Sequence, residues 1–171
     1  MTNDVRRQIV DLLPRLRRFA YVLTRNEERG DDLLQETCLR ALSRLDQWDE
    51  GTRLDSWMYR IAQNIWLDSV RAQKVRGNQL DINAHHDLPG EDGRTITDSR
   101  LTLRDLTEAM AMLPPAQQVL IALVCIEGCS YREAAEILDA PIGTIMSRLA
   151  RARHALYVAT HGEEPQAATR K

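Results

Sequence analysis

Residues 130–157, SYREAAEILDAPIGTIMSRLARARHALY, restrict the possible fold of this chain more than any other stretch. Ser130 and Glu133 have the spacing of a capping box, in which each side chain bonds a backbone amide at the start of a helix. Residues 139–141, Asp-Ala-Pro, then end that helix, because proline has no amide hydrogen to continue the bonding. The pattern predicts two helices joined by a tight turn, the arrangement of a helix-turn-helix.

The second of these helices separates an apolar stripe from a basic face. The inward positions, repeating every three or four residues, are Ile145, Leu149, Ala152 and Leu156. The outward positions are Thr144, Ser147, Arg148 and Arg151. Arginine can bond guanine edges or phosphates, and short hydroxyls permit close approach, so this face is suited to the major groove of DNA. The arginine pattern alone also fits an ordinary solvated face, but the capped helix and turn favour DNA binding.

Composition sets the class of protein. Apolar residues make up 43% and charged residues 28% of the 171 residues, as in soluble globular proteins, and no apolar run is long enough to cross a membrane. The N-terminus lacks the apolar core of a secretory signal, so we expect a cytoplasmic protein. The net charge is −2. A protein that bound DNA unaided would be more basic, so a partner is expected to supply much of the affinity.

The cysteines do not suggest a metal site. Cys38, Cys125 and Cys129 contain no Cys-x-x-Cys pair, and the His85-His86 pair lies in a segment of loop composition. We expect small buried or half-buried thiols, with no metal and no cofactor.

The N-terminal part predicts helices over residues 5–13, 14–24, 27–45 and 53–76, with a turn-rich connection at 46–52. Acidic and amide side chains gather near the start of the third helix at Asp31, Asp32, Gln35 and Glu36. They are well placed for the helix dipole. No Glu-x-x-His pattern or nearby nucleophile accompanies them, so we do not expect an enzyme.

The helix predicted over 53–76 is amphipathic. Its outer face is polar to basic and carries Arg53, Ser56, Arg60, Gln63, Asn64, Arg71 and Lys74. This face could be merely solvated or could lie along nucleic acid.

Helical periodicity is absent from residues 78–99, which are rich in Asn, Asp, Gly and Pro, as linkers are. The predicted fold is therefore all-α, with two small helical domains joined by a flexible linker. The domains are expected at 1–77 and 101–160, with the linker at 78–100 and a disordered tail at 161–171.

Three motifs together resemble the extracytoplasmic-function (ECF) group of bacterial sigma factors. Residues 31–37, DDLLQET, are similar to the region 2.2 signature, and residues 56–64, SWMYRIAQN, to the region 2.3 to 2.4 helix. Residues 142–149, IGTIMSRL, are similar to region 4.2. The resemblance implies a region 2 domain and a region 4 domain, joined by a short linker, in a protein that directs core RNA polymerase to promoters and aids promoter melting.

The resemblance also assigns roles to the exposed residues. Asp32, Gln35 and Glu36 would contact the clamp helices of the polymerase beta-prime subunit. Region 4 would contact the flap of the beta subunit. Contact with the minus-10 element and a flipped base would come from Arg60, Asn64 and Arg71 with the loop around Trp48. The minus-35 element would be read by Thr144, Ser147, Arg148 and Arg151. Trp48 and Trp57 fit the apolar stripes and are expected to be core anchors rather than base-stacking platforms.

One position departs from the family's pattern, since Met146 stands where a basic residue is frequent. The segments 51–54 and 142–144 resemble the general-stress branch of the group, which is controlled by a small anti-sigma protein. The competing interpretation is a stand-alone helix-turn-helix regulator, whose N-terminal part would bind a ligand or dimerise without region 2 motifs.

Overall fold

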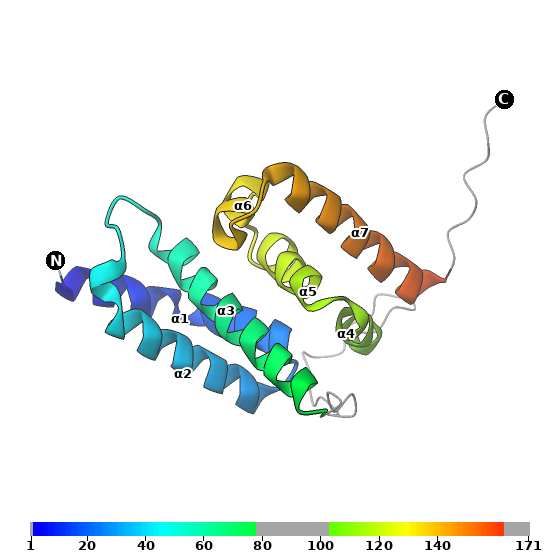
Figure 1. Ribbon diagram of the computed structural model, residues 1–171, viewed down its shortest axis with the longest axis horizontal. Coiled ribbons are helices and arrows are strands. Elements are labelled where there is room, and N and C mark those ends of the chain that lie inside the picture. Colours follow the sequence, from blue (N-terminus) through cyan, green and yellow to red (C-terminus); the bar gives the residue numbers. More distant parts are fainter. Residues whose placement is uncertain (1, 78–102, 163–171) are drawn as a thin grey trace, which may run out of the picture.

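The protein is an assembly of helices, shown in Figure 1 by a computed structural model that describes residues 2–77 and 103–162. The N-terminal half contains α1 (Thr2–Thr24), α2 (Glu27–Ser43), the 3₁₀ turn η1 (Leu45–Gln47) and α3 (Leu54–Val75). The C-terminal half contains α4 (Leu103–Met112), α5 (Pro115–Ile121), the π-helical segment η2 (Ala122–Ile126), α6 (Tyr131–Leu138) and α7 (Ile142–His161). The all-α prediction is confirmed.

The N-terminal half is a bundle in which α1, α2 and α3 pack against one another (Figure 1). Its centre holds Phe19 and Tyr59, whose rings meet edge to face with centroids 5.1 Å apart. Met58 and Leu23 are buried around them. Edge-to-face packing of two large rings adds to the free energy gained by burying them.

The predicted break at Pro14 is wrong, because α1 continues through this residue as one helix of 23 residues. Pro14 cannot bond the carbonyl group of Val10, but both residues are exposed, so water can hydrate that carbonyl. The apolar stripe that includes Leu16 and Phe19 is buried along the same helix and offsets the lost hydrogen bond.

The capping box at the start of α6 is confirmed. The Glu133 amide donates to Ser130 Oγ at 3.2 Å, and the Ser130 amide donates to the Glu133 carboxylate at 2.7 Å. Asp139, with a φ of 48°, adopts the left-handed conformation that ends α6. After this turn α7 begins at Ile142, and its stripe of Ile145, Leu149 and Ala152 is buried as predicted.

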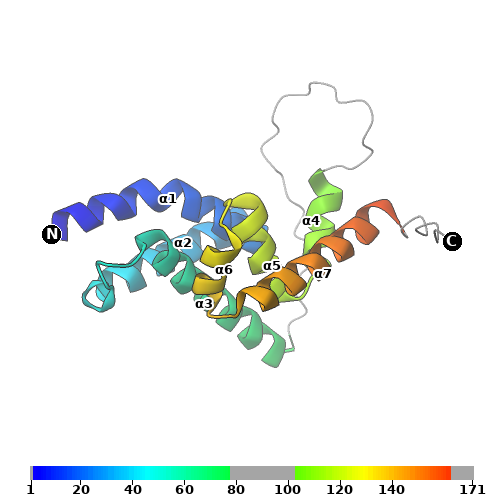
Figure 2. The same cartoon turned by 90° about the horizontal axis from the view of Figure 1, so that it is seen from above.

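The two halves share a hydrophobic core, which the sequence patterns did not predict. Val119, Ala122, Leu123, Cys129 and Ile137 of the C-terminal half belong to the same buried cluster as the central residues of α1 and α3. In Figure 2, α5 and α6 lie against the N-terminal bundle, with α3 contacting both. The C-terminal half is therefore docked on the N-terminal half by apolar packing.

The predicted linker at 78–100 lies outside the described residues, and so does the predicted tail apart from residues 161 and 162. Within the described ranges, no helix combines the length and hydropathy needed to cross a membrane.

Candidate functional site

The outer face of α7 is exposed because its opposite face is fixed in the core. Ile145, Leu149 and Ala152 are at most 1% exposed, which turns Ser147, Arg148 and Arg151 toward solvent. Thr144 is half-buried at the edge of this face. The helix holds some of these polar groups in place, since Arg151 Nε donates to the Ser147 carbonyl at 3.4 Å and Ser147 Oγ donates to the Thr144 carbonyl at 3.1 Å.

This face is electrostatically suited to an anion. No acidic residue occurs along α7. In the described part of the chain, no carboxylate lies within ion-pair distance of Arg148 or Arg151. Arg153 lies elsewhere on the helix, with Nη2 3.7 Å from Cys125 Sγ, and the contacts with Cys125 and then Tyr131 raise its pKa. Arg148 and Arg151 therefore keep their charge available for a ligand.

On α3, the structure places Arg60, Asn64 and Arg71 at exposed positions whose spacings of four and seven put them along one side of the helix. Asn64 Oδ1 accepts a hydrogen bond from Gln63 at 3.1 Å, and Arg71 forms an ion pair with Asp68 at 3.0 Å. Arg60 instead reaches the C-terminal half, where Nε donates to the Ile137 carbonyl at 3.3 Å and Nη2 donates to the Glu136 carbonyl. The three residues share a face, but Arg60 is engaged within the molecule.

Trp48 follows η1 in the connection between α2 and α3. Its ring is half-buried and packs against the main core, and so does that of Trp57. Trp48 Nε1 is buried without a hydrogen-bond partner among the described residues. In this conformation, the indole of Trp48 is therefore positioned to anchor the loop rather than to stack on a ligand.

The acidic group on α2 separates into two parts. Asp31 is bound by Arg17, whose Nε is 2.7 Å from Oδ1, and this hydrogen bond lowers the pKa of Asp31. Asp32 and Gln35 are exposed, and Glu36 forms an ion pair with Arg40 at 2.7 Å one turn along the helix. Asp32, Gln35 and Glu36 thus lie close together at the surface, while Asp31 stabilises the contact between α1 and α2.

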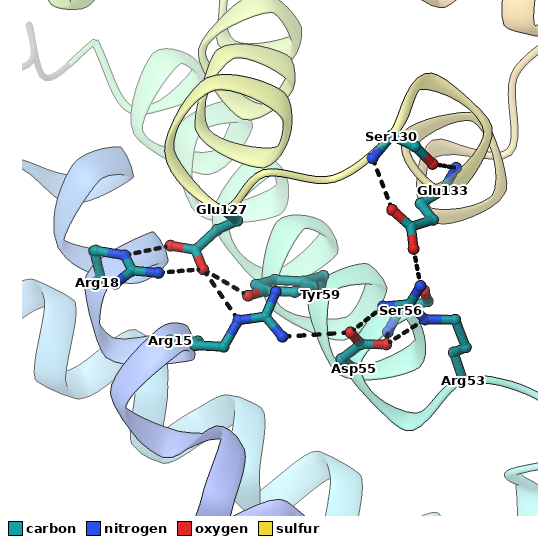
Figure 3. A network of polar contacts seen from close by, with 9 residues as sticks. All are labelled: Arg15, Arg18, Arg53, Asp55, Ser56, Tyr59, Glu127, Ser130 and Glu133. Carbon is teal, nitrogen blue, oxygen red and sulfur yellow. Dashed lines mark hydrogen bonds and ion pairs between the residues drawn. The ribbon is translucent and has the colours of Figure 1, made fainter.

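A polar network that no sequence pattern indicated joins the two halves (Figure 3). Its centre is Glu127, the residue directly after η2. The side chain of Glu127 is fully buried. Arg15, Arg18 and Tyr59 surround its carboxylate. Burial and then the negative charge of Glu127 raise the pKa of Tyr59 well above its ordinary value, so its hydroxyl stays a donor. An acid before a glycine resembles an ordinary helix end, so the sequence offered no signal for this network.

The expectation about cysteines is partly wrong. Cys129 is buried and Cys38 half-buried, but Cys125 is exposed on η2. In the described ranges, no three His, Cys, Asp or Glu side chains are grouped to hold a metal ion.

Both halves match known protein families. Residues 9–76 match the family described as Sigma-70 region 2, and residues 103–156 match the family described as Sigma-70, region 4. The ECF RNA polymerase sigma factor EcfG of Rhodopseudomonas palustris is 35% identical over 156 residues, which cover 91% of this chain and 84% of that protein. The ECF RNA polymerase sigma factor SigW of Bacillus subtilis is 27% identical over 169 residues, covering 90% of this chain and 88% of the relative.

Two solved structures are similar over both halves. The sigma factor RpoE in complex with the anti-sigma factor NepR, from Bartonella quintana, has 29% sequence identity and a TM-score of 0.71. The match covers 94% of this chain and 99% of that chain. CnrH in complex with the cytosolic domain of CnrY has a TM-score of 0.67 at 19% identity, covering 96% of this chain and 92% of that chain. The second match is a similarity of fold.

Proposed function

The chain belongs to the ECF sigma factors of the sigma-70 family, which direct RNA polymerase to promoters, and from this premise we propose which of its surfaces carry out each step. The observation that carries the proposal is the presence of region 2 and region 4 in order on one chain. A stand-alone helix-turn-helix regulator needs only the helix-turn-helix of region 4. We propose residues 1–77 and 101–160 as the two functional domains and 78–100 as the linker between them.

The outer face of α7 reads the minus-35 element. Arg148 and Arg151 supply charge without acidic partners in the described part of the chain, and Thr144 and Ser147 supply short hydrogen-bonding groups. Residues of the recognition helix of a helix-turn-helix contact base edges in the major groove, so this face suits duplex DNA.

The minus-10 element is bound along α3 by Arg60, Asn64 and Arg71. These side chains can contact phosphates and an unpaired base of the separated strand. The connection around Trp48 lies at the end of the same bundle. In this role the loop backbone and neighbouring polar groups hold the base, while the Trp48 ring remains the anchor that positions the loop.

Asp32, Gln35 and Glu36 on α2 contact the beta-prime clamp helices of core polymerase, and region 4 contacts the beta flap. The exposed acidic cluster lies on a rigid helix whose other side is buried through Leu33, Thr37 and Ala41. A small acidic patch on a fixed scaffold can pair with a basic partner without first becoming ordered. Because its partners are polymerase and the chromosome, the protein works in the cytoplasm.

An anti-sigma protein is the fourth partner. RpoE and CnrH were solved with NepR and with the cytosolic domain of CnrY, respectively, and both matches extend over the two halves of this chain. We propose that a protein of this class binds the present chain and controls its access to polymerase.

Transcription with purified components tests the proposed function. Core polymerase plus this protein, incubated with a library of genomic promoter fragments, should start transcripts at a subset that shares two sequence elements. Core polymerase alone should not select that subset. Transcripts without any shared upstream element would contradict the proposed promoter recognition.

Met146 offers a separate prediction about minus-35 binding. It is 52% exposed on α7, where a lysine could reach a phosphate. We expect Met146→Lys to tighten binding of the holoenzyme to promoter DNA at low salt and to steepen the dependence of log K on log salt by about 0.9, the value for one added phosphate contact. Fluorescence anisotropy over a range of salt concentrations measures this slope.

Met112→Lys is the matched control, because Met112 is 77% exposed on α4, a helix to which no DNA contact is assigned. Met112→Lys adds the same positive charge but should not add a phosphate contact. Equal slopes for Met146→Lys and Met112→Lys would show that residue 146 does not face the DNA backbone.

A further inference from the structure

The interface between the two halves has a buried, hydrogen-bonded carboxylate, Glu127, at its centre. Glu127 accepts hydrogen bonds from Arg18 Nε at 2.8 Å and Arg18 Nη2 at 2.9 Å, and from Tyr59 Oη at 2.9 Å. Arg15 Nε lies 3.6 Å from the same carboxylate (Figure 3). All three partners come from α1 and α3. Burying a carboxylate without such partners is costly, so Glu127 can be buried only while the halves are together.

Other contacts across the interface also join a donor of the N-terminal half to an acceptor of the C-terminal half. Arg25 Nη1 donates to Gln118 Oε1 at 2.9 Å, and Arg53 pairs with Glu133, the acid of the capping box. Arg60 donates to backbone carbonyls at the end of α6. In each case the donor belongs to the N-terminal half and the acceptor to the C-terminal half. The arrangement is a match between a row of arginines and a set of acidic and carbonyl groups.

Asp55 orients part of this row. It accepts from Arg53 Nε at 3.0 Å and lies 3.5 Å from Arg15 Nη1, so it links the two arginines that reach Glu133 and Glu127 (Figure 3). Burial alone would raise the pKa of Asp55, but the hydrogen bonds from Arg53 and the Ser56 amide lower it overall. The carboxylate therefore stays charged and holds both guanidinium groups toward the C-terminal half.

These contacts compete with promoter binding. Arg60 is one of the residues proposed above to engage the minus-10 element, and its guanidinium is bonded here to carbonyls of Glu136 and Ile137. The same contact fixes α6, the first helix of the helix-turn-helix, against α3. The Nε and Nη2 donors of Arg60 that bond these carbonyls are not available at the same time to a phosphate or base.

The distance between the two promoter elements also prevents the packed halves from binding both. The names of the minus-10 and minus-35 elements place them about 25 base pairs apart; at ~3.4 Å per base pair, this is roughly 85 Å of B-form DNA. In this structure α3 and α6 are within hydrogen-bonding distance, and α7 follows α6 after a short turn. The two DNA-binding halves cannot reach both elements while they share a core.

We propose that this packed arrangement is a self-inhibited state of the sigma factor and that Glu127 is the latch that holds it closed. The inhibitory part rests on the function proposed above, whereas the latch itself depends only on the geometry. Core polymerase, by holding the halves at the separation the promoter requires, must displace Glu127 from Arg15, Arg18 and Tyr59. The fraction of molecules already open then scales the apparent affinity for polymerase.

Glu127→Gln in the full chain tests the latch, with small-angle X-ray scattering as the first readout. Arg15 and Arg18 have side chains that are 37% and 53% exposed, so water can solvate them after the charge is lost and each half should remain folded. Losing charge-assisted hydrogen bonds should shift the closed-to-open ratio by on the order of tenfold. We expect a larger radius of gyration with unchanged helix content by circular dichroism.

Arg18→Gln removes the same contact from the other half and should open the chain as well. Glu108→Gln is the matched control, because Glu108 forms an exposed ion pair with Arg104 within α4 at 2.9 Å. An unchanged radius of gyration in both Glu127→Gln and Arg18→Gln would overturn the latch, whatever the protein's function.

Titration of core polymerase in a transcription assay is the second readout. Both opened variants should reach half-maximal transcription at a lower polymerase concentration than the wild type, by up to the factor measured for opening. Variants that open without this gain, while the wild type is active, would overturn self-inhibition. Absence of transcription with every protein, including the control, would instead refute the proposed function and with it the inhibitory role. The scattering experiment would then still test whether Glu127 holds the two halves together.

Discussion

Joint replacement of Asp32, Gln35 and Glu36 by alanine is expected to abolish most holoenzyme assembly. Two negative charges and an amide disappear from the exposed surface of α2, while the buried residues Leu33 and Thr37 stay in place. Truncating one side of a desolvated charge pair at an interface typically costs ~2–5 kcal/mol, so affinity for core polymerase should fall by about 30-fold or more. Binding of labelled protein to core polymerase without DNA measures the loss.

The chain offers a matched control in the connection after α2. Asp46, Gln47 and Glu50 have the same three side-chain types and are all exposed. Their joint replacement by alanine should leave core binding nearly unchanged. If the α2 variant instead lost its helix content by circular dichroism, these residues would have a structural role and the polymerase contact would lose its support.

Arg151→Ala should give the second large effect, a loss of about 1–3 kcal/mol in promoter binding by the holoenzyme if the side chain contacts a base edge. The loss should be accompanied by relaxed preference at one position of the minus-35 element. Arg148→Ala should behave in the same way at a different position. Binding to a set of promoters with single base changes measures both properties.

Arg153→Ala is the control on the same helix, because Arg153 lies beside Cys125 rather than on the proposed reading face. Its effect should be smaller and independent of sequence. Uniform weakening by Arg151→Ala on every promoter variant would indicate a phosphate contact, and loss of core-polymerase binding would contradict the assignment to minus-35 recognition.

Local signals in the sequence predicted the helix-turn-helix well. The capping box of Ser130 and Glu133, the interruption at Pro141 and the stripe through Ile145 and Leu149 depend on interactions within a few residues, and the structure has all of them. Pro14 was misleading for the same reason. A local rule predicts a helix boundary there, but burial of the rest of α1 outweighs one lost hydrogen bond.

Contacts between distant residues could not be predicted in this way. Glu127 and Arg18 are separated by 109 positions, and neither has a local pattern that distinguishes a latch from an ordinary surface charge. The loop composition of residues 78–99 also favoured two independent domains, whereas the shared core brings Ile137 into the cluster built around Phe19 and Tyr59. Arg60 is exposed on α3 as predicted, but its partners on α6 come from this long-range packing. Gln63, predicted on the same exposed face, is instead buried.

The central claim is that this chain recognises promoters only as part of RNA polymerase, and footprinting with and without core polymerase tests it most directly. The net charge of −2 leaves few phosphates that the protein can neutralise alone. On polymerase the second DNA contact becomes intramolecular, which raises the apparent affinity. At physiological salt we predict no stable footprint for the purified protein, and protection of both the minus-10 and minus-35 elements once core polymerase is added. A tight palindromic footprint by the protein alone would contradict this account and indicate a dimeric repressor.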